Sequence, residues 1–299
     1  MKRRDFLGRV AGAAMAAPLI GSVAYSKPED SLPEVPRVTF GKTGIATTRL
    51  AQGTGFNGWN RQSDQTRQGF EGFVNLLRHG YDRGIRLFDL ADLYGTHYYF
   101  REALRFIPRE EVTILTKLWW RYNDENPKRL SLDEQRRSAR TAVERFRMEL
   151  GVDAIDILLM HNVTSAEWDE DMAGYLEVLQ EYRDRGVIRA LGMSCHTLVA
   201  LKRAAETPWV EIALTRINPY GKHMDGTPEE VMPVQRRFKE RGANVIGMKI
   251  FGAGGLVDKR DECMKFAQNL GYLDAMTIGA RSPEEIDDNI RLMAKYPAS

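Results

Sequence analysis

Four polar residues that could move a proton lie where short apolar runs of the chain end. Asp89 and Tyr94 lie in the segment FDLADLYG, Lys117 closes the run VTILTK, and His161 closes the run AIDILLMH. A phenol can give its proton to an oxygen that gains negative charge, and a nearby ammonium lowers the phenol pKa from its reference value near ~10. A carboxylate can hold that ammonium, and an imidazole can position or polarise the oxygen. Each residue type alone is common in structural roles, but together at three consecutive run ends they predict one catalytic site.

The elements that must position these residues alternate between apolar runs and amphipathic stretches. Eight runs are apolar on both faces, as strands of a parallel sheet buried on both sides require, and they cover residues 50–56, 85–91, 112–117, 154–161, 187–194, 210–217, 243–250 and 273–280. Eight such alternations in about 260 residues predict an α/β fold, a (β/α)8 TIM barrel, whose chemistry lies at the carboxyl ends of its strands. A doubly wound open sheet is the competing fold, but no G-x-G-x-x-G follows the first strand.

Turn and capping signals mark where individual elements begin. The segment RVTFGKTGIATTRL predicts an N-terminal β-hairpin that turns at residues 41–44. Ser131-x-x-Glu134 is a capping box ahead of an apolar stripe, so a helix should begin there. The segments Thr227-Pro228-x-Glu230 and Ser282-Pro283-x-Glu285 repeat this start signal, with proline at the first helical position.

The composition is that of an ordinary globular protein. The 299 residues are 43% hydrophobic and 28% charged. A formal net charge of +2 does not favour a nucleic-acid partner. The two cysteines, Cys195 and Cys263, are too few for a disulfide scaffold and are not spaced as a metal site, so we interpret them as isolated thiols.

The first 24 residues have the pattern of an export signal. Basic residues precede a weakly apolar run, and small residues at its end permit cleavage after Ala24. The pair Arg3-Arg4 resembles a twin-arginine (Tat) signal, which implies the Tat export machinery as a partner and an exported, periplasmic protein. The apolar run is too short for a comfortable membrane span, so no stable membrane anchor is expected. Residues 25–36 then form a linker, and residues 37–299 form the barrel.

The chain resembles the aldo/keto reductase family from about residue 37 to about residue 293. The resemblance rests on FDLADLYG (88–95), TK (116–117), LLMH (158–161) and the opening GKTGIATTRLAQGTG (41–55). It implies an NAD(P)-dependent oxidoreductase that transfers hydride between nicotinamide C4 and a small carbonyl or alcohol substrate. In that reaction Tyr94 would be the general acid or base, assisted by Lys117, Asp89 and His161.

The same resemblance implies where a nicotinamide cofactor would bind. The residues concerned are Ser194, Arg216, Asn218, Lys249, Gly252, Gly254, Gly279, Arg281 and Asn289. Cys195 stands where the family usually has asparagine, and Glu285 stands where its NADPH enzymes often carry arginine. A carboxylate at Glu285 would repel a 2′-phosphate, and Arg281 would have to compensate. The cofactor usual in the family slightly favours NADP(H) over NAD(H).

Three tryptophans could wall a substrate pocket. Trp59 follows the first strand, and Trp119 and Trp120 follow the catalytic lysine candidate. Aromatic walls suit flat aldehydes and also sugars stacked on a ring face, so they do not decide the substrate. His97 and His223 have no role in this scheme, and no metal site is expected from them.

Two other functions are compatible with parts of this pattern. A nicotinamide-binding redox sensor or accessory protein with little turnover would use the same residues, and an exported reductase has no obvious supply of fresh reduced cofactor. A metal-dependent barrel enzyme such as a sugar isomerase would need several carboxylates and histidines at strand ends, where Asp89 and His161 alone stand out. Sustained turnover with added cofactor would separate an enzyme from a sensor.

Overall fold

The computed structural model describes residues 32–119 and 127–298. Eight parallel strands close into a barrel in the order β10-β3-β4-β5-β6-β7-β8-β9. Their bounds are β3 (Leu50–Gly53), β4 (Leu87–Asp89), β5 (Thr113–Trp119), β6 (Ile155–Val163), β7 (Ile188–Cys195), β8 (Ile212–Arg216), β9 (Asn244–Met248) and β10 (Ala275–Gly279). Each of the eight predicted strands is present, and each pairs with its neighbour along the chain, so the predicted (β/α)8 barrel is confirmed.

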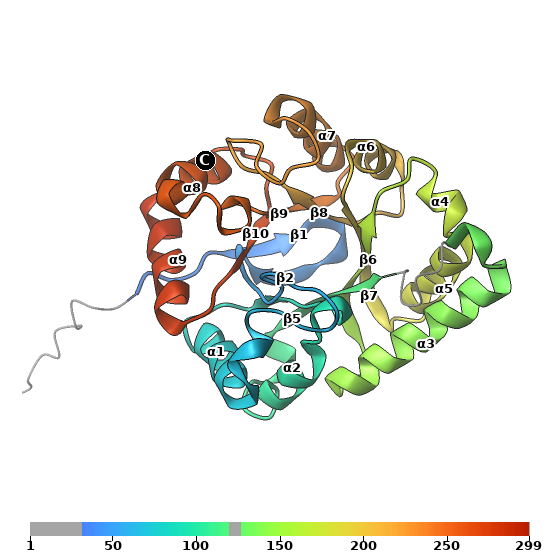
Figure 1. Ribbon diagram of the computed structural model, residues 1–299, viewed down its shortest axis with the longest axis horizontal. Coiled ribbons are helices and arrows are strands. Elements are labelled where there is room, and N and C mark those ends of the chain that lie inside the picture. Colours follow the sequence, from blue (N-terminus) through green and yellow to red (C-terminus); the bar gives the residue numbers. More distant parts are fainter. Residues whose placement is uncertain (1–31, 120–126, 299) are drawn as a thin grey trace, which may run out of the picture. The chain divides into compact units, whose positions relative to one another are not determined.

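Helices form an outer ring around these strands (Figure 1). Their bounds are α1 (Phe70–Asp82), α2 (His97–Ala103), α3 (Leu132–Leu150), α4 (Trp168–Asp171), α5 (Ala173–Asp184), α6 (Leu198–Glu206), α7 (Pro228–Glu240), α8 (Arg260–Gln268) and α9 (Pro283–Lys295). Short 3-10 turns lie in the hairpin and in the loops that connect the strands and helices: η1 (Gly41–Thr43), η2 (Thr66–Gln68), η3 (Asp92–Tyr94), η4 (Arg109–Glu111), η5 (Pro127–Arg129), η6 (Gly252–Gly254) and η7 (Val257–Lys259). The ring covers the outer face of the strands, which is why the strands are apolar on both sides.

The predicted helix starts are present at α3 and α7 and are altered at α9. The Ser131 hydroxyl accepts the Glu134 backbone N–H, and the Glu134 carboxylate accepts the Ser131 backbone N–H at 2.8 Å, which is a complete capping box. Thr227 and Glu230 repeat this arrangement at α7. At α9 the carboxylate of Glu285 accepts a backbone N–H from the residue before the cap, so the reciprocal half of that capping box is missing.

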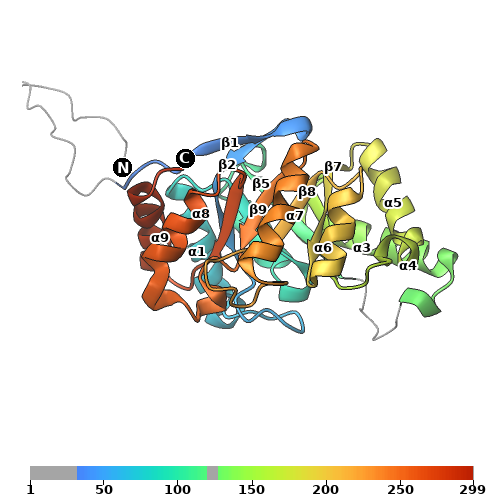
Figure 2. The ribbon, with the colours of Figure 1, turned by 90° about the horizontal axis from the view of Figure 1, so that it is seen from above.

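The predicted hairpin closes one end of the barrel. Strands β1 (Arg37–Phe40) and β2 (Ile45–Thr48) pair antiparallel and turn through Gly44, whose φ of 65° suits glycine. Phe40 and Ile45 are fully buried and belong to the same core cluster as the inward side chains of the strands. Figure 2 shows the hairpin lying across the barrel end. Because β2 leads directly into the start of β3, the hairpin covers the amino ends and leaves the carboxyl ends to the loops.

The expected export signal lies outside the described part of the chain, as do residues 25–31 of the linker and Trp120. Within the described part, no helix combines the length and apolar character needed to cross a membrane.

Candidate active site

The four residues predicted to act together meet at the carboxyl end of the barrel. Asp89, Lys117 and His161 lie on the adjacent strands β4, β5 and β6, and Tyr94 ends the turn η3 that follows β4. The Lys117 ammonium pairs with the Asp89 carboxylate and lies 4.9 Å from the centre of the Tyr94 ring. The Tyr94 hydroxyl lies 3.5 Å from His161 Nε2. Strands β5 and β6 run two residues past their predicted ends, so Lys117 and His161 lie inside strands rather than at their last positions.

Lys117 keeps its positive charge although its side chain is only 1% exposed. Burial lowers the pKa of Lys117, but the charges and hydrogen bonds of Asp89 and Tyr94 together outweigh burial and raise that pKa above its ordinary value. Lys117 also donates to the Leu90 carbonyl at 2.9 Å. The hydroxyl of Thr277 on β10 donates to the other oxygen of Asp89 at 2.9 Å and holds the carboxylate in place. Thr277 was not predicted from the sequence.

The pKa of Tyr94 departs from the sequence-based expectation. Burial raises this pKa above 10.0, and the Lys117 ammonium lowers it by a smaller amount. The effect of Lys117 therefore has the predicted sign, but the expected net lowering is wrong because burial dominates. At neutral pH the phenol keeps its proton and can give it to an oxygen that gains negative charge.

His161 is a neutral imidazole in this site. Burial, with Lys117 as the next largest cause, holds the pKa of His161 well below 6.5. No residue of the described chain gives its buried Nδ1 atom a hydrogen bond. His161 can therefore exchange hydrogen bonds with Tyr94 and with a substrate oxygen, but it brings no charge at neutral pH.

Two glycines hold the ring of Tyr94 by its opposite edges. A Cβ atom added to Gly55 would lie 2.3 Å from Tyr94 Cε2, and one added to Gly58 would lie 2.3 Å from Tyr94 Cδ1. Neither glycine has a positive φ, so close packing against the ring explains them better than backbone conformation does. The sequence offered only a weak signal for this contact, the recurrent glycines of GTGFNG after the first strand.

Two predicted cofactor residues carry polar atoms that are buried and unpaired. The Ser194 hydroxyl on β7 and Nε of Arg216 on β8 have no hydrogen-bond partner among residues 32–119 and 127–298. Arg216 otherwise contacts His196 and forms a 3.3 Å ion pair with Asp225. Buried polar atoms rarely stay unpaired, so this corner fits a ligand with an amide group. No pattern in the sequence points to His196 or Asp225.

Asn218 uses its side chain within its own loop. Its amide group donates to the carbonyls of Lys222 and Lys249 at 2.8 and 3.1 Å. Its oxygen accepts the backbone N–H groups of Tyr220 and Lys222, both at 3.1 Å. The amide is therefore already well satisfied, and direct contact of Asn218 with a cofactor stays a prediction.

Lys249 adds a third cation to this end of the barrel. It lies just after β9 with a positive φ of 58°, an uncommon conformation for a lysine. Burial lowers the pKa of Lys249, and the nearby charges of Arg216 and Lys117 lower it further. Lys117, Arg216 and Lys249, all at the carboxyl end of the barrel, favour a ligand that carries or develops negative charge.

The predicted glycines of the phosphate region differ in what they require. Gly252 and Gly254 have positive φ values of 54° and 86°, which explains glycine at both positions. A Cβ atom on Gly254 would also lie 2.9 Å from the ring of Phe56. Gly279 ends β10 and is exposed, and a Cβ atom there would meet only ordinary contacts at 3.6 Å.

The residues predicted for the adenosine end lie at the start of α9. The Arg281 side chain pairs with Glu285 at 3.3 Å and lies 5.4 Å from the ring centre of Phe56. Arg281, which we expected to compensate for the carboxylate of Glu285 at a 2′-phosphate, is therefore paired with that same carboxylate. Asn289 lies on α9 and is 8% exposed.

Two of the three predicted pocket tryptophans lie together. The ring centres of Trp59 and Trp119 are 5.3 Å apart, edge to face at 66°. Trp59 is 61% exposed although it is a large apolar side chain. Its loop also carries Gly58, against which the ring of Tyr94 packs.

A closed barrel with a proton-transfer cluster at the carboxyl ends of its strands is the architecture that barrel enzymes use. Residues 49–270 match the sequence profile of the Aldo/keto reductase family. The chain therefore belongs to the aldo/keto reductase family, whose members are NAD(P)-dependent oxidoreductases.

Known relatives are similar over part of the chain. A D-threo-aldose 1-dehydrogenase of a Pseudomonas species is 25% identical over 217 residues, which are 64% of this chain and 64% of that protein. An NADH-specific methylglyoxal reductase of Escherichia coli is 28% identical over 170 residues, which are 52% and 51%. The chain thus spans between 51% and 64% of the length of these relatives. A Bombyx mori aldo-keto reductase solved with NADP has the same fold, with a TM-score of 0.65, 20% identity and coverage of 89% of this chain and 90% of that one.

Proposed function

We propose that this protein is an NAD(P)-dependent oxidoreductase that transfers hydride between nicotinamide C4 and a small carbonyl or alcohol substrate. The observation that carries the proposal is the buried ammonium of Lys117, which is paired with Asp89 and lies 4.9 Å from the centre of the Tyr94 ring. Membership of the aldo/keto reductase family supports the reaction class.

In this scheme the side chains manage the proton. A bound nicotinamide supplies or accepts the hydride. Tyr94 gives its proton to the substrate oxygen as that oxygen gains charge, and Lys117 stabilises the phenolate left behind. Asp89 keeps Lys117 protonated, and neutral His161 positions the oxygen by a hydrogen bond. In the reverse direction the phenolate takes the proton of an alcohol.

Different residues would bind the successive parts of the cofactor, from the nicotinamide amide to the adenosine. Ser194 and Arg216 would bind the amide, and Lys249, Gly252 and Gly254 would contact the phosphates. Gly279, Arg281 and Asn289 would contact the adenosine end, and Asn218 would contact the amide beside Arg216.

We propose NADP(H) ahead of NAD(H). Arg281 would break its ion pair with Glu285 and bind the 2′-phosphate instead. The cost is small because this ion pair is exposed. The NADP bound to the Bombyx mori enzyme supports this choice, whereas the carboxylate of Glu285 and the NADH-specific Escherichia coli relative weigh against it. Fluorescence titration with both reduced cofactors decides, and a much tighter NADH affinity would overturn the choice.

The proposed substrate is a small molecule that packs against Trp59, Trp119 and Trp120. The two curated relatives are named for an aldose and for methylglyoxal, so both belong in the first assay panel.

We also propose that the protein is exported to the periplasm by the Tat machinery. Residues 1–24 would be the signal, residues 25–36 the linker and residues 37–299 the barrel. Cell fractionation of the protein with Arg3→Lys and Arg4→Lys tests this, since retention in the cytoplasm is expected and unchanged export would contradict it.

Steady-state turnover of Tyr94→Phe tests the catalytic proposal, with Tyr98→Phe as the matched control because Tyr98 is 52% exposed. Loss of a general acid should lower kcat by about 10²- to 10⁴-fold, with cofactor affinity unchanged, and the control should keep its rate. Undiminished turnover in Tyr94→Phe would refute the role of the phenol. A single stoichiometric oxidation by the wild-type protein would instead indicate a redox sensor.

A further inference from the structure

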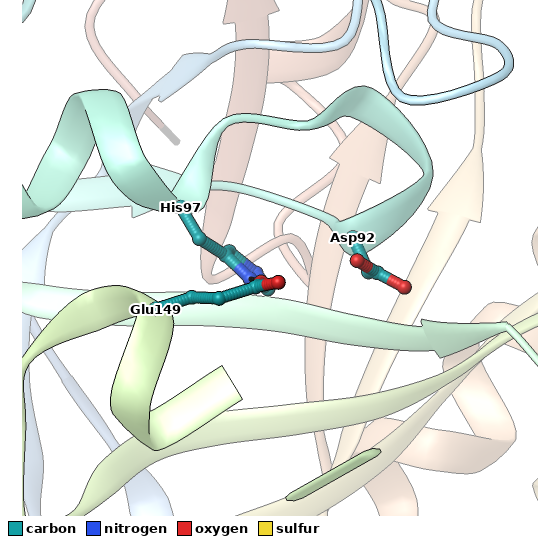
Figure 3. Close-up of side chains that lie close together, drawn as sticks. All are labelled: Asp92, His97 and Glu149. Atoms are coloured by element: carbon teal, nitrogen blue, oxygen red, sulfur yellow. Dashed lines mark hydrogen bonds and ion pairs between the residues drawn. The ribbon is translucent and has the colours of Figure 1, made fainter. Parts of the chain in front are cut away.

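Three buried residues that lie close together take no part in the reaction scheme. Asp92 in η3, His97 on α2 and Glu149 on α3 converge, and their polar atoms lie within 4.8 Å of one another (Figure 3). They are 0%, 1% and 4% exposed. A histidine and two carboxylates this close could bind a divalent cation, or they could form an ionic network, and their existing partners distinguish the two.

Both carboxylates are already paired with arginines. Arg145 binds both oxygens of Asp92 at 2.9 and 2.7 Å, and Arg61 binds Asp92 at 2.8 Å. Glu149 accepts hydrogen bonds from Arg61 at 3.0 Å and Arg145 at 3.1 Å, and it contacts His97 Nδ1 at 2.8 Å. Each arginine bridges both acids, so their charges balance without a metal ion. We call these five side chains the anchor network.

The anchor network joins the segments that carry the phenol and the ammonium. Asp92 begins the three-residue turn that Tyr94 ends, and the backbone N–H of Arg61 donates to the Leu93 carbonyl of that turn at 2.8 Å. On the other side, His97 Nε2 lies 2.7 Å from the hydroxyl of Thr116, the residue before Lys117 on β5. The network therefore spans the turn, α3 and the lysine strand.

We propose that the anchor network positions the ring of Tyr94 over the ammonium of Lys117. This inference rests on the proposed function, because it assigns the network a role in that proton transfer. None of its members touches the reacting atoms in this scheme, so they are positioning residues. A misplacement of about 1 Å in a catalytic group can cost about 10²-fold in rate, which is the effect expected when the network is weakened.

Asp92→Asn tests the proposal because it keeps the shape of the side chain and removes its charge. Asp156→Asn is the matched control, since Asp156 is also buried and held between two arginines, Arg109 and Arg189, both at 2.7 Å, but lies near the amino end of β6. Both variants should unfold at lower temperature. Asp92→Asn alone should lower kcat by about 100-fold with KM little changed, and Asp156→Asn should change kcat by less than about 3-fold.

A spectroscopic measurement reads the ring position without turnover. In protein labelled with 3-fluorotyrosine, the Tyr94 signal is assigned by its absence in Tyr94→Phe. This signal should shift in Asp92→Asn and in Arg61→Gln and should stay in place in Asp156→Asn. Arg61→Gln is the milder of the two network changes because the Arg61 side chain is 45% exposed.

The outcomes separate this inference from the proposed function. A Tyr94 signal that stays in place in both network variants would overturn the inference even if Tyr94→Phe is inactive. Undiminished turnover in Tyr94→Phe would refute the proposed function, whatever the signal does. A stoichiometric divalent cation in the purified protein, whose removal shifts the Tyr94 signal, would overturn the ionic assignment in favour of a metal site.

Discussion

Replacing Gly58 with alanine should displace the Tyr94 ring while leaving the barrel intact. The new Cβ atom would lie 2.3 Å from Tyr94 Cδ1, whereas carbon atoms in contact are about 3.5–4.0 Å apart. The ring must therefore retreat by more than about 1 Å. Because Gly58 does not have a positive φ, its backbone accepts alanine, and the clash with the ring is the main effect.

The displacement sets the size of the expected effect. A shift of about 1 Å in a catalytic group costs about 10²-fold in kcat, and overpacking costs about 1–3 kcal/mol of stability. Gly55→Ala should act alike from the opposite edge of the ring, where its Cβ atom would lie 2.3 Å from Cε2. Gly72→Ala is the control, because a Cβ atom there meets only Gln68 at 3.5 Å and should stabilise α1 by about 0.5–1 kcal/mol.

The assay is kcat from the absorbance of the reduced cofactor at saturating substrate, together with thermal unfolding of each variant. Gly58→Ala and Gly55→Ala should be slow and folded at the assay temperature, and Gly72→Ala should keep the wild-type rate. If Gly58→Ala stays within about 3-fold of Gly72→Ala, ring position does not limit the reaction and the reasoning fails.

Three other outcomes follow from the charges of the site. The pKa of Tyr94 lies above 10.0, so alcohol oxidation, which needs the phenolate, should speed up steadily from about pH 7 to about pH 9; a flat pH profile contradicts this. Asp89→Asn should cost about 3–5 kcal/mol in urea unfolding at neutral pH, because it leaves the buried ammonium of Lys117 without its partner; a loss below about 1 kcal/mol would show that Asp89 is not needed. Asp89 and Tyr94 together raise the pKa of Lys117 above 10.5, so the stabilisation from Asp89 is present below pH 10.5 and lost only as the pH rises through the higher value. Glu285→Gln should tighten NADPH binding relative to NADH by about 5-fold in fluorescence titrations, and an unchanged ratio would remove Glu285 from the cofactor site.

The fold and the main site residues could be predicted because their signals are local. Strands buried on both faces must be apolar throughout, and this marks all eight runs along the chain. A lysine such as Lys117 or a histidine such as His161 near the carboxyl end of such a run has little packing role, so its type already indicates chemistry.

The residues that the sequence could not identify depend on which segments the closed barrel brings together. Thr277 reaches Asp89 across 188 positions of the chain, and Arg61 reaches Glu149 across 88. No local pattern encodes such pairs. The direction of the pKa shift of Tyr94 could not be predicted from local sequence either, because it depends on burial that only the folded structure reveals.

The most direct test of the central claim is the kcat of the double variant Tyr94→Phe/Lys117→Met compared with both single variants. If Lys117 acts through the phenol, each single variant loses about 10²-fold or more, and the double variant falls no more than about 3-fold below Tyr94→Phe. Losses that multiply to about 10⁴-fold would show that the two side chains act independently, and the proposed proton-transfer unit would be refuted.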